Sequence, residues 1–212
     1  MINITNEDNM KLMARYEDNH FDLAIVDPPY GIGASEMTLG SGVKKWKKGK
    51  KWDNEIPNKK YFDELFRISK NQIIWGGNYF LENLKNTRCF LSWDKMQSFG
   101  GSDFELAWTS FEKASKVFRM TRIEAYSNGN KIIKDPFIKI HPTQKPVKLY
   151  EWILMNYAND GDKILDTHLG SGSIAIACHN LGYNLTACEL DKEYYDAAIK
   201  RLNEHTAQLR II

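Results

Sequence analysis

Short apolar segments typical of strands alternate along this chain with longer segments of helical periodicity. The run at residues 21–26 predicts a buried strand, and the apolar spacing within residues 61–70 predicts a helix. Further strands are expected at residues 72–75, 89–93, 104–111, 116–120, 163–166 and 184–190, and further helices at 147–158, 173–182 and 192–208. Strands that alternate with helices favour an α/β domain with a mostly parallel sheet. The length of 212 residues suits one such domain, with or without an insertion.

The first strand ends at a stiff turn, Asp27-Pro28-Pro29-Tyr30. Two prolines remove two backbone N–H donors and fix two φ angles, so no regular element continues there. The turn therefore holds a carboxylate and an aromatic ring at the end of a buried strand. Such a turn is either a strand terminator with a packed tyrosine or a rigid frame for functional groups.

A second strand-to-helix junction carries glycines and acids. The strand at 163–166 ends on Asp166, and a loop with Gly170 and Gly172 leads into the next helix. Glycines let a backbone approach a ligand, and a helix N-terminus offers free N–H groups. Glu189 follows the next strand, 19 residues after Gly170, where nucleotide-binding α/β units place an acid against ribose hydroxyls. The alternative is a tight turn with a surface glutamate, and the absence of a G-K-[ST] sequence disfavours a phosphate-binding P-loop.

Positive charge is concentrated in one segment although the formal net charge is only +2. Residues 44–52, KKWKKGKKW, contain six lysines and two tryptophans and no acid. This local excess indicates either a face that binds a polyanion or a solvated lysine-rich surface.

Several classes of protein are disfavoured by what the sequence lacks. No apolar run is long enough to cross a membrane, and the polar N-terminus does not resemble a secretory signal. Three cysteines without a C-x-x-C pair argue against a disulfide framework, and five histidines without H-E-x-x-H spacing argue against a metal centre. We expect a cytoplasmic protein without a metal.

Three segments resemble motifs IV, X and I of DNA amino-methyltransferases: DPPY at 27–30, HPTQKP at 141–146 and DTHLGSGS at 166–173. Their order resembles the β arrangement of the N6-adenine enzymes. The resemblance implies a Rossmann-like methyltransferase fold in circularly permuted order, with helices on both faces of the sheet. It also implies site-specific transfer of a methyl group from S-adenosylmethionine to the N6 amine of a flipped adenine in double-stranded DNA. The whole chain, 1–212, would then be one methyltransferase domain.

The resemblance assigns the catalytic role to Asp27, Pro28, Pro29 and Tyr30. An exocyclic amine is a poor nucleophile because its lone pair is delocalised into the ring. Two acceptors on its hydrogens, the Asp27 carboxylate and the Pro28 carbonyl, would free that lone pair, and the prolines would hold the carbonyl in place. Tyr30 would stack on the extruded base.

The same resemblance assigns residues to the cofactor. Asp166, Gly170 and Gly172 would line its methionine part, and Glu189 would accept hydrogen bonds from the ribose, with Asp191 as the alternative acid. The remaining expected cofactor residues are His141, Thr143, Lys145, His168, Ser173 and Leu190. Lys145 could equally contact nucleic-acid phosphate. His168 stands where Phe is usual and Ser173 where Thr is usual, so His168 could stack, donate a hydrogen bond or titrate near neutrality.

DNA contacts are expected from two segments, the loop 31–60 and the candidate target-recognition insertion 94–140. The loop is longer than about 15 residues, a length typical of functional or disordered segments. Lysines can neutralise phosphates and tryptophans can stack on bases. The expected DNA-contacting residues are Lys44, Lys45, Trp46, Lys47, Lys48, Lys50, Lys51, Trp52, Lys95, Arg119, Arg122 and Lys134.

Several alternatives stay open at this stage. An N4-cytosine enzyme would share the architecture but usually carries Ser before Pro-Pro, and a protein-glutamine enzyme usually carries Asn. An RNA adenine methyltransferase uses the same amine chemistry, and a non-catalytic DNA-binding module could retain a remnant cofactor pocket. The recognition sequence is not apparent. Relatives in this motif order are often dimers, which leaves a homodimer open. No partner nuclease is evident, so a restriction–modification enzyme and an orphan or phage-borne enzyme are both compatible.

Overall fold

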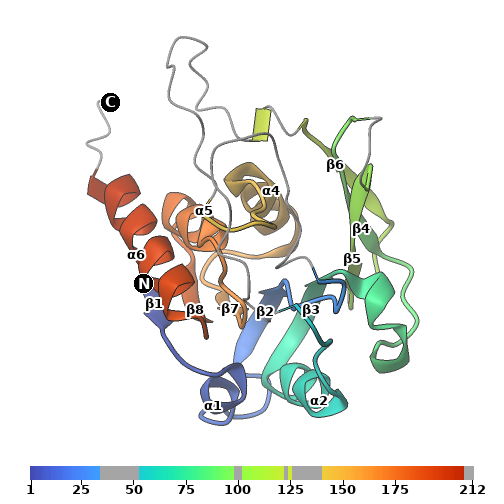
Figure 1. Ribbon diagram of the computed structural model, residues 1–212. Coiled ribbons are helices and arrows are strands. Elements are labelled where there is room, and N and C mark those ends of the chain that lie inside the picture. Colours follow the sequence, from blue (N-terminus) through green and yellow to red (C-terminus); the bar gives the residue numbers. More distant parts are fainter. Residues whose placement is uncertain (34–52, 98–101, 122–123, 126–139, 208–212) are drawn as a thin grey trace.

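Figure 1 shows the computed structural model, in which one sheet lies between two groups of helices. The structure describes residues 1–33, 53–97, 102–121, 124–125 and 140–207. The sheet has eight strands in the order β1-β8-β7-β2-β3-β5-β4-β6. The strands are β1 (Ile2–Thr5), β2 (Phe21–Val26), β3 (Ser69–Trp75), β4 (Phe90–Asp94), β5 (Phe104–Thr109), β6 (Lys116–Arg119), β7 (Lys163–Asp166) and β8 (Asn184–Cys188).

The sheet is mostly parallel. All neighbours from β1 to β3 are parallel, β5 runs antiparallel to both β3 and β4, and β6 is parallel to β4. The expectation of an α/β fold with a mostly parallel sheet is confirmed.

Helices cover both faces of the sheet. In Figure 1, α1 and α2 lie on one face, and α4, α5 and α6 on the other. Their bounds are α1 (Asn9–Met13), α2 (Lys59–Ile68), α4 (Val147–Tyr157), α5 (Ser173–Leu181) and α6 (Lys192–Ala207), and two 3₁₀ turns are η1 (Gly77–Tyr79) and η2 (Leu81–Asn83). Among the described residues, none of these helices has the length and apolar character needed to span a bilayer.

The two faces explain why the sequence of β2 is apolar without alternation. Leu23 and Ile25 belong to the core shared with α4 and α5, whereas Ala24 and Val26 belong to the core shared with α1 and α2. A strand buried on both faces needs apolar side chains at successive positions. β2 therefore lies in the middle of the domain.

The observed elements differ from the expected ones mainly at their ends. The helix expected at 61–70 begins at Lys59, because the Asn58 side chain caps it, and it ends at Ile68, where β3 takes over. β1 and α1 were not expected. β1 is a short edge strand that alternates apolar Ile2 and Ile4 with polar residues, so it lacks the apolar run of a central strand.

The order of the strands reverses between β2 and β7. The chain passes from β2 to β3 on one side and from β7 to β8 on the other. Leu23 pairs with Ile164 and Ala24 with Leu165, so the two parallel strands end beside each other. Ligands of α/β proteins bind outside the carboxyl ends of strands at such a reversal. The turn at Asp27 and the loop after Asp166 both begin at this point.

Candidate active site

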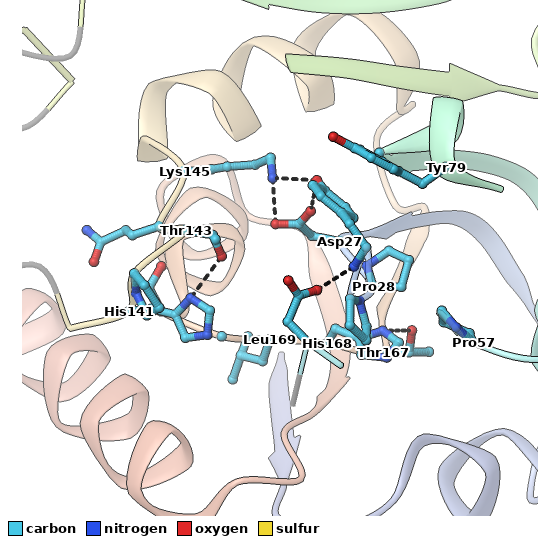
Figure 2. Close-up of a pocket in the computed structure, with 18 of the residues that line it drawn as sticks. Asp27, Pro28, Pro57, Tyr79, His141, Thr143, Lys145, Thr167, His168 and Leu169 are labelled. Atoms are coloured by element: carbon cyan, nitrogen blue, oxygen red, sulfur yellow. Dashed lines mark hydrogen bonds and ion pairs between the residues drawn. The ribbon is translucent and has the colours of Figure 1, made fainter. Parts of the chain in front are cut away.

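A large cavity opens where the strand order reverses, with a volume of about 1240 Å³ (Figure 2). That volume exceeds the range of roughly 300–1,000 Å³ typical of small-molecule sites, so it has room for more than one ligand. Segments far apart in the sequence meet here. The expected site residues that line it are Asp27, Pro28, Pro29, Tyr30, Lys95, His141, Thr143, Lys145, His168, Gly170, Ser173, Glu189 and Leu190.

The turn after β2 is held by a residue that the sequence analysis missed. Pro28 and Pro29 have no N–H, so the first backbone donors after Asp27 are those of Tyr30 and Gly31. Both donate to one carboxylate oxygen of Asp53, at 2.6 and 3.1 Å. Asp53 is 1% exposed. The turn is therefore rigid by its own prolines and anchored by a buried carboxylate from a distant segment.

Both carboxylate oxygens of Asp27 have partners. The Tyr30 hydroxyl donates to Oδ1 at 2.6 Å. Lys145 Nζ donates to Oδ2 at 2.5 Å, and a dashed line joins these two residues in Figure 2. Burial raises the pKa of Asp27, and the ammonium of Lys145 acts against that rise. Burial also keeps the pKa of Tyr30 well above its ordinary value, so its phenol remains a neutral donor.

Lys145 joins Asp27 to a second carboxylate, from β5. Its Nζ lies 3.1 Å from Glu105 Oε2, and Lys95 Nζ lies 2.9 Å from Glu105 Oε1. Burial opposes ionisation of Glu105, but Lys145 and Lys95 outweigh it and lower the pKa of Glu105 to about 2. Lys145 was expected to face the cofactor or DNA phosphate. Its side chain is instead 1% exposed and paired with two acids.

The ring of Tyr30 lies among aromatic and glycine residues near the end of β3. The Tyr79 ring lies parallel to it, and Phe80 meets it edge-on. A Cβ added at Gly76 would lie 2.2 Å from Tyr30 Cε1, so no other residue fits at that position without displacing the ring. Tyr79 also lines the cavity. The sequence signal for these residues is the GGNYF segment directly after β3.

Glu189 holds the glycine loop from the end of β8. Its Oε2 accepts from Gly170 N at 2.8 Å and its Oε1 from Asp191 N at 2.9 Å. Asp191, the alternative ribose acid, caps α6 by accepting from the N–H groups of Glu193 and Tyr194. Burial raises the pKa of Glu189. Both acids line the cavity, and both accept from backbone N–H groups.

Leu190 is 70% exposed at the wall of the cavity. It follows Glu189 directly, so the loop after β8 presents a carboxylate and an apolar side chain to the same space.

Two of the expected cofactor residues do not line the cavity. Asp166 is 2% exposed and accepts from His168 N at 2.9 Å, and burial raises its pKa to about 8. Gly172 has φ +70°, and a Cβ there would lie 3.1 Å from Ala198 Cβ. Its small size therefore serves the packing of α5 against α6 rather than the approach of a ligand.

His168 is held in a neutral form, so it does not titrate near neutrality, which was one of the roles left open for it. The Asn9 side-chain amide lies 3.0 Å from Nε2, and Thr167 Oγ1 lies 3.0 Å from Nδ1. An amide N–H donated to Nε2 leaves the ring proton on Nδ1, facing Thr167. Burial lowers the pKa of His168 to about 4. Its ring also meets Tyr61 edge-on, so it combines a stacking contact with hydrogen bonds.

The HPTQKP segment lines the cavity. His141 Nδ1 lies 3.1 Å from Thr143 Oγ1, and the His141 ring lies against Tyr194 of α6. Ser173 Oγ donates to the Lys145 carbonyl at 2.7 Å, which ties the segment to the start of α5. The hydroxyl of Ser173 is thus engaged by the protein, as is the charge of Lys145.

The expected DNA-contacting residues fall into two groups. Lys95 lines the cavity but is paired with Glu105, and Arg119 pairs with Asp94 away from the cavity. The other expected residues lie outside the described part of the chain: Lys44, Lys45, Trp46, Lys47, Lys48, Lys50, Lys51, Trp52, Arg122 and Lys134.

Part of the chain is similar to a family of DNA-modifying enzymes. Residues 109–200 match the family model described as DNA methylase. The chain is 24% identical over 233 residues to the Type II methyltransferase M.HpaI of Haemophilus parainfluenzae, covering 92% of this chain and 72% of that relative. These likenesses support an S-adenosylmethionine-dependent DNA methyltransferase.

Solved structures of methyltransferases are also similar to this chain. The complex of M1.HpyAVI with SAM matches the methyltransferase with a TM-score of 0.58 and 25% identity, over 96% of this chain and all of the other. The cytosine-N4-specific PvuII DNA methyltransferase matches with a TM-score of 0.63 and 14% identity, over all of this chain and 88% of the other, which shows a shared fold. The methyltransferase acts on DNA and uses S-adenosylmethionine as cofactor.

The cavity of the methyltransferase suits that cofactor. S-adenosylmethionine carries a positive sulfonium, and the carboxylates of Asp27, Glu189 and Asp191 line the same cavity. Gly170 presents bare backbone to the cavity, and a Cβ there would be in ordinary contact with the His141 ring, at 3.8 Å. Leu190 offers an apolar surface beside Glu189. A carboxylate can accept hydrogen bonds from a ribose, bare backbone can lie against a chain of methylene groups, and an apolar side chain can pack on a purine ring.

Proposed function

We propose that this methyltransferase transfers a methyl group to the exocyclic N6 amine of adenine in duplex DNA, after the base is extruded into the cavity. The observation that carries the proposal is the position of Asp27. Its carboxylate lies in the cavity at the end of β2, one strand away from the glycine loop that follows β7. The acceptor base and the cofactor would therefore occupy neighbouring parts of one space.

The turn supplies what an unreactive amine needs. The Asp27 carboxylate and the Pro28 carbonyl would accept the two N–H groups of the amine, which draws its nitrogen toward a tetrahedral shape and frees the lone pair. Bound S-adenosylmethionine would supply a methyl group activated by a positive sulfur. Asp27 is also placed to receive the proton that the methylated nitrogen has to lose. The Tyr30 hydroxyl, which donates to Oδ1, fixes the carboxylate during these steps.

Cofactor contacts are proposed from the residues that line the cavity. Glu189 would bind the ribose hydroxyls and Leu190 would pack on the adenine ring, while the backbone at Gly170 would follow the methionine part. His141 and Thr143 line the same cavity and would lie at the methionine end of the cofactor. Asp166 would support the loop from inside the protein by accepting from His168 N.

DNA contacts are proposed for the basic loop within residues 31–60. Its flanking residues are tied together at the cavity, because Gly33 N donates to the Asp53 carbonyl at 3.1 Å. Both ends of the segment between Gly33 and Asp53 thus lie near the catalytic turn, and the segment carries six lysines. Lysines there suit phosphate contacts around an extruded base. Residues 94–140 remain the candidate for target recognition.

We also propose that the enzyme acts in the cytoplasm, where its DNA substrate lies. From the motif order we propose that it forms a homodimer. The single-domain organisation over 1–212 is likewise part of the proposal. Gel filtration at several protein concentrations tests the dimer directly.

Identification of the product tests the proposal. The protein is incubated with duplex DNA and S-adenosylmethionine labelled in the methyl group, and the digested nucleosides are separated. Label in N6-methyldeoxyadenosine supports the proposal. Label in N4-methyldeoxycytidine, or transfer only to RNA, contradicts the proposed acceptor, and DNA retention without any transfer indicates a binding module.

A further inference from the structure

Four buried or half-buried charges form a line that ends at the catalytic turn. Asp27 Oδ2 lies 2.5 Å from Lys145 Nζ, which lies 3.1 Å from Glu105 Oε2. Glu105 Oε1 lies 2.9 Å from Lys95 Nζ. The line alternates negative and positive charges, and each residue comes from a different segment: the end of β2, the segment before α4, β5 and the end of β4.

Lys145 is the most deeply enclosed member of this line. Its side chain is 1% exposed, and its Nζ also lies 5.0 Å from the centre of the Trp75 ring and 5.8 Å from that of Tyr30. An ammonium removed from water is tolerated only where partners compensate its charge. Here Asp27 and Glu105 do so together. The position of Lys145 therefore depends on both carboxylates.

Glu105 has no direct contact with the catalytic carboxylate among the described hydrogen bonds and ion pairs, yet it controls the group that does. It shares the charge of Lys145 with Asp27 and is itself held by Lys95. With a neutral side chain at position 105, the ammonium of Lys145 would no longer be shared between two carboxylates and would pair more strongly with Asp27. A carboxylate so tightly paired is a weaker acceptor for an amine.

We propose that Lys145 and Glu105 are positioning residues that set the orientation and basicity of Asp27. Lys145 fixes Oδ2 and keeps the carboxylate ionised, while Glu105 limits how much of the ammonium charge falls on it. This inference rests on the proposed function for its effect on methyl transfer. The expected effect of Lys145 and Glu105 on the Asp27 carboxyl group does not depend on that function.

The titration of Asp27 also depends on groups from the other elements around it. Tyr30 contacts it from its own turn, and Asp166 and Tyr150 are titratable groups in the same buried region, where burial raises the pKa of each. Asp166 acts from the end of β7 and Tyr150 from α4. These groups are unchanged in the variants below, so differences among those variants report on Lys145 and Glu105.

The test compares Glu105→Gln and Lys145→Met with the unaltered protein and with Lys200→Met, which removes a lysine that is 77% exposed on α6. Two quantities are measured: the pKa of the Asp27 carboxyl by carbon NMR without DNA, and the single-turnover rate of methyl transfer against pH. Only the ionised Asp27 accepts from the amine, so the rate rises with pH through its pKa.

The two variants are expected to shift the pKa of Asp27 in opposite directions. Lys145→Met should raise it and move the rise of the rate to higher pH, whereas Glu105→Gln should lower it and move the rise to lower pH. The plateau rate should fall about tenfold or more in both, since misplaced groups cost that much. Lys200→Met should change neither quantity, and Lys145→Arg should restore the pKa of Asp27.

The proposal is overturned if Glu105→Gln leaves both the pKa of Asp27 and the plateau rate unchanged, or if both variants shift the pKa in the same direction. Glu105→Gln nearly preserves shape, so its result decides the matter even if Lys145→Met does not fold. If the unaltered protein produces no N6-methyladenine, the proposed function fails, and the NMR titration still tests the pairing itself.

Discussion

The Tyr79 ring lies parallel to the Tyr30 ring, with the ring centres 5.0 Å apart and 13° between their planes. Tyr79 belongs to η1, which follows β3, so a neighbouring strand supports the aromatic residue of the catalytic turn. The Tyr30 hydroxyl meanwhile donates to Asp27. The Tyr30 ring therefore stacks on Tyr79 through its face and holds Asp27, the proposed acceptor for the amine, through its hydroxyl.

Tyr79→Ala should lower kcat/KM for methyl transfer by about 2–10-fold, because a stacked aromatic pair contributes roughly 0.5–1.5 kcal/mol. Tyr79→Phe keeps the ring and should stay close to the unaltered rate. Leu81→Ala, at a residue that is 64% exposed in η2, is the matched control. An equal loss in Tyr79→Phe and Tyr79→Ala would assign the effect to the hydroxyl and not to stacking.

Gly76→Ala should abolish most methyl transfer while the protein stays folded. Gly76 has φ +70° and Gly161 has φ +88°, so alanine at either position costs about 1–2 kcal/mol in backbone strain. Only at Gly76 would the new Cβ meet the Tyr30 ring, whereas nothing lies within 4 Å at Gly161. Thermal unfolding and transfer rate are measured for Gly76→Ala and Gly161→Ala. Similar transfer rates in the two variants would show that the contact with Tyr30 is unimportant.

His168 should make the stability of the protein depend on pH between about 4 and 6.5. Its pKa is lowered from 6.5 to about 4 in the folded protein, so the unfolded chain binds the proton more strongly in this window. The contribution of His168 is fully present above pH 6.5 and decreases as pH falls toward 4. Melting temperatures of the unaltered protein and of His168→Asn are compared from pH 4.5 to 7.5. The variant should show the flatter profile, and parallel profiles would mean that His168 is not held neutral.

The sequence predicted the meeting of Asp27 and the glycine loop because simple rules govern that part of the fold. β2 and β7 are apolar and therefore central, and functional loops follow the carboxyl ends of parallel strands. The repeated strand–helix pattern identified both elements to within a residue. A stiff turn and a glycine loop at those ends were enough to indicate one site.

The charge pairs could not be derived in the same way. Lys145 and Asp27 are 118 residues apart, and the lysine was assigned to the cofactor from its motif alone. Glu105 lies within β5, and its ion-pair partners can be identified only when the elements beside β5 are known. Asp53 was missed for the same reason. It accepts from two backbone N–H groups, and nothing in the sequence around those groups indicates which carboxylate binds them. Pairings of this kind depend on tertiary structure and leave no periodic signal.

The account depends most on Asp27 as the acceptor for the amine, and Asp27→Ala tests it directly. Methyl transfer to duplex DNA and binding of S-adenosylmethionine are measured on the same preparation, with thermal unfolding as the check on folding. We predict that transfer falls by about a hundredfold or more while cofactor affinity stays within a few fold. Transfer that persists in Asp27→Ala, or a loss of cofactor binding that matches the loss of transfer, would contradict the account.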